Sequence, residues 1–400
     1  MRFRQTAFIL AAIAVAVAFV PPVVHAQGAP AGSAPVLGGT AGPVPPIFAA
    51  SAILIDARTG AVLYEHAADV RRPPASTTKI LTAIIALEHL RPDTMVPISK
   101  RAAEQRSGSA IGLEVGERWR ADDLLNALIL ASANDAAVAL AEAVAGSVER
   151  FADLMNQKAR AIGARSSTFV VPHGLYDPQH RTTARDLALI TRYALRHPAF
   201  AALVRQQTFT WMRHGLPPRV VVNRNKLLWR LPGADGVKTG WIPESGQCLV
   251  ASATRGEWQL IAVALDSPDV FADATRLLEY GFSYFRLVRV AAREAVLARR
   301  PLPRADEMVS AAVPEDVYVV LPRDAALHWE VRLRPDLLPP IRRGMPIGEL
   351  MVYADGRLVA RQLVVAAEDV PARSLWRHVL AWVRGLVTRS TLKRLRPGRI

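Results

Sequence analysis

The sequence predicts an α/β domain for residues 47–288, a small all-β domain for residues 289–370 and an amphipathic helix for residues 371–400. Helical periodicities and hairpin signals alternate within the first of these segments, which is typical of one mixed domain. After about Val290, short apolar runs alternate with Pro, Gly and Asp turns, and this pattern indicates strands alone. A chain of 400 residues is long enough for two such domains.

The residues ahead of the first domain are expected to lie outside it. Residues 1–26 have a basic start, an uncharged apolar run and small residues before a cleavage site at Ala26, as a secretory signal peptide does. An uncleaved membrane anchor is the alternative, but the run is short for a span and ends at Pro21. Residues 27–46 are rich in Gly, Ala and Pro and predict a flexible leader.

Two hairpins are expected in the α/β segment. Residues 51–56 and 61–64 flank a turn that ends at Gly60, and residues 248–253 and 258–265 flank another that contains Gly256. Four helices are expected as well. Their ranges are residues 80–90, 122–130, 135–144 and 271–285. The first is apolar on most sides and is therefore expected to be central.

Charge and cysteine content limit the partners. The formal net charge is +15, and from Arg373 onward there are eight Lys or Arg residues but no Asp or Glu. An exported chain is not expected to meet nucleic acid, so this charge indicates a membrane surface. The single cysteine, Cys248, excludes an internal disulfide and lies in an apolar run, which predicts a buried thiol. No CxxC, HExxH or Gly-rich phosphate loop is present, so no metal or nucleotide cofactor is expected.

Three short strings stand in one order along the chain: Ser76-Thr77-Thr78-Lys79, Ser132-Ala133-Asn134 and Lys238-Thr239-Gly240. A serine hydroxyl is a weak nucleophile until a base takes its proton. Lys79 lies one helical turn from Ser76 and can be that base if it is neutral. Burial and the positive charge of Lys238 are expected to lower the pKa of Lys79. At a helix start, the Ser76 N–H is also free to meet an oxyanion, so the strings predict an acyl-transfer site.

Each string is common by itself. A second Ser-x-x-Lys tetrapeptide begins at Ser390 in the basic tail, with no partner strings after it, and we interpret Ser390 as a surface residue. Ser132 and Asn134 alone are more often helix caps, and the string at Lys238 alone is more often the end of a strand. All three in order, each with fitting local structure, favour a catalytic site.

With these strings, the chain resembles the serine-type D-alanyl-D-alanine carboxypeptidases, which are low-molecular-mass penicillin-binding proteins of the bacterial cell wall. The resemblance covers roughly residues 47–370. Further shared segments are Pro74-Ala75, Asp135-Ala136-Ala137, Pro172-His173-Gly174-Leu175, Thr183-Ala184-Arg185-Asp186 and Asp235-Gly236-Val237. It implies the penicillin-binding transpeptidase/β-lactamase-like fold, with an antiparallel sheet flanked by helices, a helical subdomain and a following β domain.

The resemblance also implies residue roles. Ser76 would form the acyl-enzyme, Lys79 would be its base and Ser132 would relay the proton. The implied substrate-binding residues are Asn134, Lys238, Thr239, Gly240 and Trp241. Asn134 would hold the substrate amide, Lys238 and Thr239 would meet a terminal carboxylate, and the N–H groups of Ser76 and Trp241 would form the oxyanion hole. His173 is expected to be structural, in a loop over the site, rather than an additional acid or base.

Two positions depart from the family pattern. Ile242 stands where relatives often carry a hydroxyl residue, and Ala272 stands where many carry an arginine that helps to bind the terminal carboxylate. Arg255 and Arg276 are candidates to compensate. The predicted function is a DD-carboxypeptidase that removes the terminal D-Ala from peptidoglycan pentapeptides and is acylated by penicillin. The alternatives are a DD-endopeptidase acting on crosslinks and a non-catalytic penicillin- or cell-wall-binding protein. The β domain and the basic tail disfavour a β-lactamase.

The C-terminal segment has the pattern of a surface helix. Its apolar face comprises Leu375, Trp376, Val379, Leu380, Val383, Leu386 and Val387. Arg373, Arg377 and Arg384 lie on the opposite side, which indicates a helix in the interface of an anionic membrane. A helix packed on the β domain is the alternative. Residues 373–400 are therefore expected to hold the exported protein on the periplasmic face of the inner membrane as a peripheral protein.

Overall fold

The computed structural model describes residues 42–213 and 215–373. The expected signal peptide (1–26), most of the expected leader (27–46) and nearly all of the expected terminal helix (371–400) lie outside these residues. No helix of the described part is long and apolar enough to cross a membrane.

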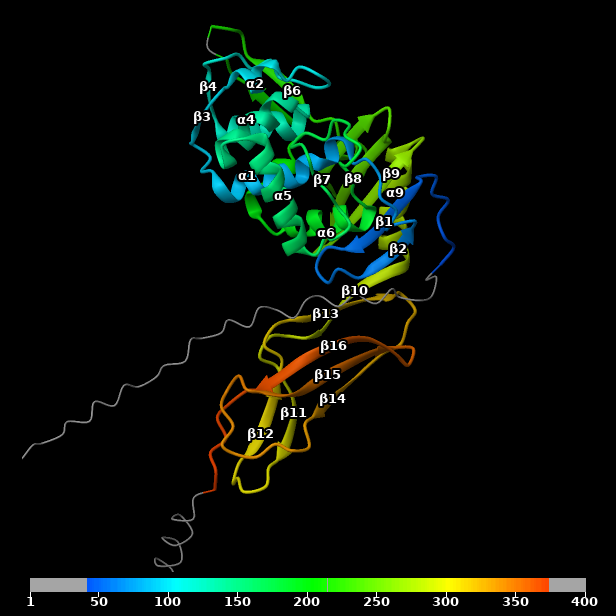
Figure 1. The fold of residues 1–400 in the computed structure, drawn as a ribbon. Coiled ribbons are helices and arrows are strands. Elements are labelled where there is room, and N and C mark those ends of the chain that lie inside the picture. Colours follow the sequence, from blue (N-terminus) through cyan, green and yellow to red (C-terminus); the bar gives the residue numbers. More distant parts are fainter. Residues whose placement is uncertain (1–41, 214, 374–400) are drawn as a thin grey trace, which may run out of the picture. The chain divides into compact units, whose positions relative to one another are not determined.

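A five-stranded antiparallel sheet organises the first domain, with the strand order β2-β1-β9-β8-β7 (Figure 1). Its strands are β1 (Ser51–Asp56), β2 (Val62–His66), β7 (Ala234–Ile242), β8 (Gly246–Arg255) and β9 (Trp258–Ser267). Both hairpins expected from the sequence are present, as β1–β2 and β8–β9. The sheet brings together the N-terminal and C-terminal parts of this domain, because β1 pairs with β9.

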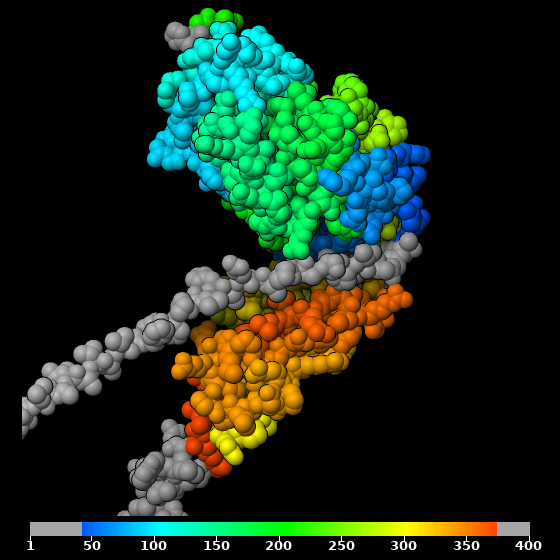
Figure 2. Space-filling model, in the orientation of Figure 1, coloured from blue at the N-terminus to red at the C-terminus, as the bar shows by residue number. Residues whose placement is uncertain are grey.

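Each face of this sheet has its own apolar core. Successive side chains of a strand point to opposite faces, so Ile53 and Ile55 belong to one core and Leu54 to the other. The Leu54 face is covered by α9 (Val270–Tyr284), which was expected as residues 271–285. The opposite face is covered by helices, which form one continuous mass of side chains in the cyan-to-green part of the space-filling view (Figure 2).

Seven α-helices lie between β2 and β5 in the described chain. They are α1 (Lys79–His89), α2 (Lys100–Glu104), α3 (Ala121–Asn126), α4 (Asn134–Ala145), α5 (Val148–Ile162), α6 (Ala184–Leu195) and α7 (Pro198–Val204). α1 is central, as expected: eight of its residues, from Lys79 to Ala86, are buried. The helix expected over residues 122–130 is divided, because α3 gives way to the wider π-helical turn η2 (Ala127–Ala131).

Short hairpins and one short helix complete the first domain. They are β3 (Met95–Pro97) with β4 (Arg118–Arg120), β5 (Thr208–Trp211) with β6 (Arg219–Val222), and α8 (Leu227–Arg230). The 3₁₀ turn η1 (Ala75–Thr78) leads directly into α1. These short elements were not predicted from the sequence.

Described by itself, the C-terminal domain is all β. A pair, β10 (Phe285–Ala291) with β13 (Val317–Pro322), accompanies a five-stranded sheet of order β11-β12-β16-β15-β14. The sheet strands are β11 (Val296–Pro301), β12 (Met308–Ala312), β14 (Leu327–Leu333), β15 (Pro346–Ala354) and β16 (Arg357–Ala366). A separate core that includes Val309, Leu350 and Val364 lies within this domain.

The core between α9 and the sheet gives a stability prediction. Leu277 of α9 is fully buried against the sheet, whereas Leu216 is 58% exposed. Leu277→Ala should lower the free energy of unfolding by about 2–5 kcal/mol, because it removes buried methyl groups and leaves a cavity. The matched change Leu216→Ala should stay within about 0.5 kcal/mol of the wild type. Urea unfolding measures both, and equal losses would contradict the assignment of this core.

Candidate active site

Ser76 lies in a strained turn at the start of α1. It is the second residue of η1, and the residue before it, Ala75, has a φ of +47°, a conformation that L-residues rarely adopt. The Thr78 hydroxyl donates to the Ala75 carbonyl at 2.8 Å, which supports the turn from inside. The sequence therefore places the Ser76 hydroxyl on a bend that its neighbours hold in shape.

A loop and a buried histidine brace the same turn. His180 Nδ1 accepts the Val170 N–H at 2.9 Å, so its Nε2 carries the proton and donates to Thr78 Oγ1 at 2.9 Å. Burial lowers the pKa of His180 to about 4, so the ring is neutral near pH 7 and keeps a single N–H. Gly174 (φ +84°) packs so closely that a Cβ there would lie 1.8 Å from the Ala75 oxygen. The loop containing Gly174 thus rests directly on the turn.

Lys79 points into a small polar space beside Ser76. Its Nζ lies 3.0 Å from Ser76 Oγ, 2.6 Å from Asn134 Oδ1 and 2.8 Å from the His173 carbonyl oxygen. The side chain is fully buried, and burial holds the pKa of Lys79 well below its usual range, with further lowering from the positive charges of Lys238 and Arg224. The i, i+3 spacing predicted this contact with Ser76, and the expected effect of Lys238 on Lys79 is present.

The three contacts of Lys79 fit a neutral amine. Such an amine has two N–H groups and one lone pair. The carbonyl oxygens of Asn134 and His173 can only accept hydrogen bonds, so they take both N–H groups. The lone pair is then left for the Ser76 hydroxyl, which can act as the donor. In this state, the arrangement can remove a proton from Ser76.

Ser132 and Asn134 lie at the break between η2 and α4. Ser132 has a left-handed backbone (φ +63°) directly after the π turn, and Asn134 is the first residue of α4. Both side chains are buried. Asn134 reaches Lys79 directly, whereas the Ser132 hydroxyl forms no hydrogen bond with Ser76 or Lys79 among residues 42–213 and 215–373. The three strings meet in space, but the contact that a relay through Ser132 requires is not formed in this structure.

Strand β7 brings Lys238, Thr239, Gly240 and Trp241 to the site. Gly240 lies against the turn that contains Ser76, since a Cβ there would approach the Ser76 nitrogen to 3.0 Å. Lys238 is buried, donates from Nζ to the Thr239 carbonyl at 2.9 Å, and has a pKa lowered to about 7 by burial and by Arg224. Trp241 is 64% exposed. The edge of the sheet therefore runs alongside the Ser76 N–H.

Arg224 was not predicted as a site residue. Its charge lowers the pKa of both Lys79 and Lys238. The chain is fixed on either side of it by buried asparagines: Asn225 donates to the Gly236 carbonyl at 2.7 Å, and Asn223 donates to the Gln206 carbonyl at 2.9 Å. An arginine between two asparagines, shortly before the third string, is the signal that could have found it.

The two arginines expected to compensate for Ala272 are engaged elsewhere. Arg255 forms an ion pair with Glu279, and Arg276 forms one with Asp273 of its own helix. Neither forms a hydrogen bond or an ion pair with a predicted site residue within the described chain. His173, as expected, serves the site through its loop: its carbonyl oxygen accepts from Lys79, and burial lowers the pKa of its ring to about 3.

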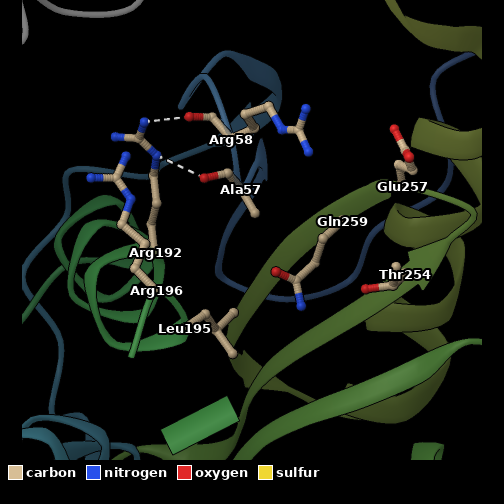
Figure 3. Close-up of a pocket in the computed structure, with 8 residues that line it drawn as sticks. All are labelled: Ala57, Arg58, Arg192, Leu195, Arg196, Thr254, Glu257 and Gln259. Carbon is tan, nitrogen blue, oxygen red and sulfur yellow. Dashed lines mark hydrogen bonds between the residues drawn. The ribbon is translucent and has the colours of Figure 1, made fainter. Parts of the chain in front are cut away.

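A hollow of about 410 Å³ lies elsewhere, at the end of the sheet that carries the β8–β9 turn (Figure 3). Its lining residues are Ala57, Arg58, Arg192, Leu195, Arg196, Thr254, Glu257 and Gln259. Arg192 donates to the main-chain oxygens of Ala57 and Arg58, as the dashed lines show. None of the predicted site residues lines this hollow, so it is separate from the site at Ser76.

Comparisons with known proteins agree with this geometry. Residues 39–269 match the family described as D-alanyl-D-alanine carboxypeptidase, and residues 285–372 match the C-terminal domain of penicillin-binding protein 5. The chain is 31% identical to the D-alanyl-D-alanine carboxypeptidase DacF of Bacillus subtilis (80% of this chain, 86% of the relative) and 33% identical to DacC of Escherichia coli (82% and 85%).

Solved structures of penicillin-binding proteins and related enzymes have a similar fold. Penicillin binding protein 5 from Haemophilus influenzae aligns with a TM-score of 0.76 at 29% identity, covering 82% of this chain and 100% of that chain. A mutant of the Streptomyces K15 DD-transpeptidase aligns with a TM-score of 0.57 at 34% identity, covering 60% of this chain and 100% of that chain.

The buried lysines predict a pH dependence of stability. The pKa of Lys238 is about 7 in the folded chain and about 10.4 in an unfolded one, so between these values the unfolded state holds a proton that the folded state lacks. Stability should therefore rise with pH across this range, by at most about 1.4 kcal/mol per pH unit for one lysine. In Lys238→Met, the gain from pH 7 to pH 9 should be smaller than in the wild type.

Urea unfolding at pH 7, 8 and 9 measures this difference. Lys100→Met is the matched control, because Lys100 is 79% exposed and should leave the pH dependence unchanged. Parallel curves for the wild type and Lys238→Met would contradict the lowered pKa.

Proposed function

The chain belongs to the D-alanyl-D-alanine carboxypeptidase family of serine peptidases, and from this membership we propose that Ser76 is the residue acylated in its reaction. The observation that carries the proposal is the contact between Lys79 Nζ and Ser76 Oγ at 3.0 Å, with both N–H groups of a neutral Lys79 bound to carbonyl oxygens. The proposed substrate is the D-Ala-D-Ala end of a peptidoglycan pentapeptide.

In the proposed acylation, Lys79 takes the proton of the Ser76 hydroxyl as Oγ attacks the carbonyl carbon of the penultimate D-Ala. The N–H groups of Ser76 and Trp241 stabilise the oxyanion that forms. Collapse of this intermediate breaks the peptide C–N bond, and the proton passes to the leaving amine, with Ser132 as the proposed relay. The terminal D-Ala departs, and water then hydrolyses the ester and restores the Ser76 hydroxyl.

The substrate is proposed to lie between β7 and the start of α4. Asn134 would bind its amide, while Lys238, Thr239 and the Gly240 backbone would bind the carboxylate end. Arg224 is proposed to supply the positive charge that is missing at Ala272. The charge of Arg224 acts on both Lys79 and Lys238. Arg255 and Arg276, in contrast, form ion pairs elsewhere. A guanidinium is well suited to a carboxylate because it can donate two parallel hydrogen bonds.

Penicillin labelling tests the nucleophile. Because a β-lactam carbonyl can acylate the same hydroxyl, fluorescent penicillin should label the wild type covalently, and Ser76→Ala should abolish the label. Ser390→Ala is the matched control, since Ser390 begins the other Ser-x-x-Lys tetrapeptide of the chain and should label fully. Label that persists in Ser76→Ala and disappears in Ser390→Ala would refute the assignment.

Substrate choice is tested with purified protein. Incubation with pentapeptide muropeptides should release one D-Ala per stem peptide, and Ser76→Ala should release none. Crosslinked muropeptides, supplied separately, should be cleaved far more slowly. Cleavage of the crosslinked substrate alone would instead favour the endopeptidase.

The location of the protein is part of the proposal. Residues 1–26 would direct export and residues 27–46 would form a leader, while residues 47–288 and 289–370 would form the catalytic and β domains. Residues 371–400 would then hold the enzyme on the periplasmic face of the membrane through their arginines and apolar face. The secretory pattern at residues 1–26 and the charge of the tail support this proposal.

Deletion of residues 374–400 tests the anchor. The truncated protein should move from the membrane fraction to the soluble periplasmic fraction, because it loses seven of the eight basic residues of the tail and its apolar face. Penicillin labelling of the truncated protein should stay at the wild-type level, which controls for folding. Unchanged sedimentation with membranes would rule out this anchor.

A further inference from the structure

The direction of the Asn134 amide decides what Lys79 can do. In the structure, Asn134 Oδ1 accepts an N–H from Lys79 at 2.6 Å, and this leaves the lone pair of a neutral Lys79 for Ser76. An amide turned by half a rotation would present its NH₂ group instead. That group would occupy the lone pair, and the amine would then face Ser76 with an N–H and could not take its proton.

One loop holds this amide in its observed direction. The Ser107 carbonyl accepts from Asn134 Nδ2 at 2.7 Å, and the Ser109 carbonyl accepts from the Asn134 backbone N–H at 2.7 Å. Between them, Gly108 (φ +74°) lies so close that a Cβ there would be 3.0 Å from Asn134 Nδ2. A carbonyl at this place fixes the nitrogen of the amide and so turns its oxygen toward Lys79.

The same loop is held by the residue next to Asn134. The Asp135 carboxylate, which is 1% exposed, accepts backbone N–H groups from Ile111 (3.1 Å), Gly112 (2.8 Å) and Leu113 (3.1 Å), and a fourth from Ala136 (2.9 Å). Successive N–H groups that converge on one anion form a nest, which here includes the left-handed Gly112 (φ +86°). No Lys, Arg or His of the described residues forms an ion pair with Asp135, so these amides are what solvates its charge.

We propose that Asp135 is a positioning residue for acylation: by binding the N–H groups of residues 111–113, it holds the Ser107 carbonyl against Asn134 and so directs the Lys79 lone pair to Ser76. This inference rests on the proposed acylation of Ser76. Asp135 touches neither Ser76 nor Lys79 and acts through the loop and Asn134.

The charge of Asp135 provides a second, separable effect. Burial lowers the pKa of Lys79, and the positive charges of Lys238 and Arg224 lower it further. The negative charge of Asp135 raises it. The nearby rings of His173 and His180 have pKa values lowered to about 3 and about 4, so both are neutral above about pH 5. Removing the negative charge should therefore lower the pKa of Lys79 further, so that the lysine stays neutral to a lower pH.

The variant Asp135→Asn separates positioning from general stability. The rate constant for acylation of the full chain by fluorescent penicillin is measured from pH 4 to pH 9, beside thermal unfolding. The plateau should fall by about 100-fold, the scale of an effect that misplaces a reacting group by about 1 Å. The acid limb of this pH profile, where the rate constant falls because Lys79 becomes protonated, should move to lower pH. A wild-type plateau, or a lower plateau with an unmoved acid limb, would overturn the inference.

A matched pair of glycine variants tests the loop, including the case in which Asp135→Asn does not fold. Gly112 (φ +86°) and Gly116 (φ +85°) both have left-handed backbones and open space where a Cβ would lie. Each alanine substitution therefore introduces similar strain, but only Gly112 donates to Asp135. Gly112→Ala should slow acylation several-fold with an unmoved acid limb, and Gly116→Ala should not slow it. Equal rates for the two variants would overturn the inference.

The wild type distinguishes this inference from the function on which it rests. If the wild type shows no label at Ser76, the proposed acylation itself is wrong. If the wild type is labelled and both Asp135→Asn and Gly112→Ala are labelled at its rate, only the role of Asp135 is wrong.

Discussion

The site depends on one buried lysine, Lys79, that must be uncharged and must direct its lone pair to Ser76. Lys79 is fully buried, and no carboxylate forms an ion pair with it in the described part of the chain. Its partners are two carbonyl oxygens and a hydroxyl, while the charges of Lys238 and Arg224 disfavour its protonation. A paired carboxylate would stabilise the ammonium form and leave no lone pair for the proposed proton transfer from Ser76. The helices, the loop at Gly174 and strand β7 all contribute to this environment.

Local patterns predicted much of this arrangement because they report local geometry. One helical turn between Ser76 and Lys79 places their side chains together, and the break at Ser132 is where α4 begins. The hairpins of the sheet follow from short apolar runs on either side of turns that contain glycine, Gly60 and Gly256. The apolar runs after residue 290, at residues 317–321, 327–333, 347–353 and 358–365, coincide with β13, β14, β15 and β16.

Features that depend on contacts distant in sequence could not be predicted in this way. The effect of Arg224 on Lys79 arises only after β7 and the segment before α8 are packed beside α1. The nest around Asp135 depends on a loop whose shape needs a left-handed residue at Gly112. The division of the expected helix at Asn126 reflects a wider π turn, and helical periodicity does not distinguish it from an α-helix over five residues.

The position of β7 in the sheet has a consequence for selectivity. It is the last strand in the order β2-β1-β9-β8-β7, so its outer main-chain groups have no strand partner in the described structure. Such an edge can receive an extended peptide as an additional strand, through main-chain hydrogen bonds that every residue offers. Recognition of this kind is indifferent to most side chains of the incoming peptide. If the stem peptide binds there, as the proposed reaction requires, variation in its inner residues would change the binding little.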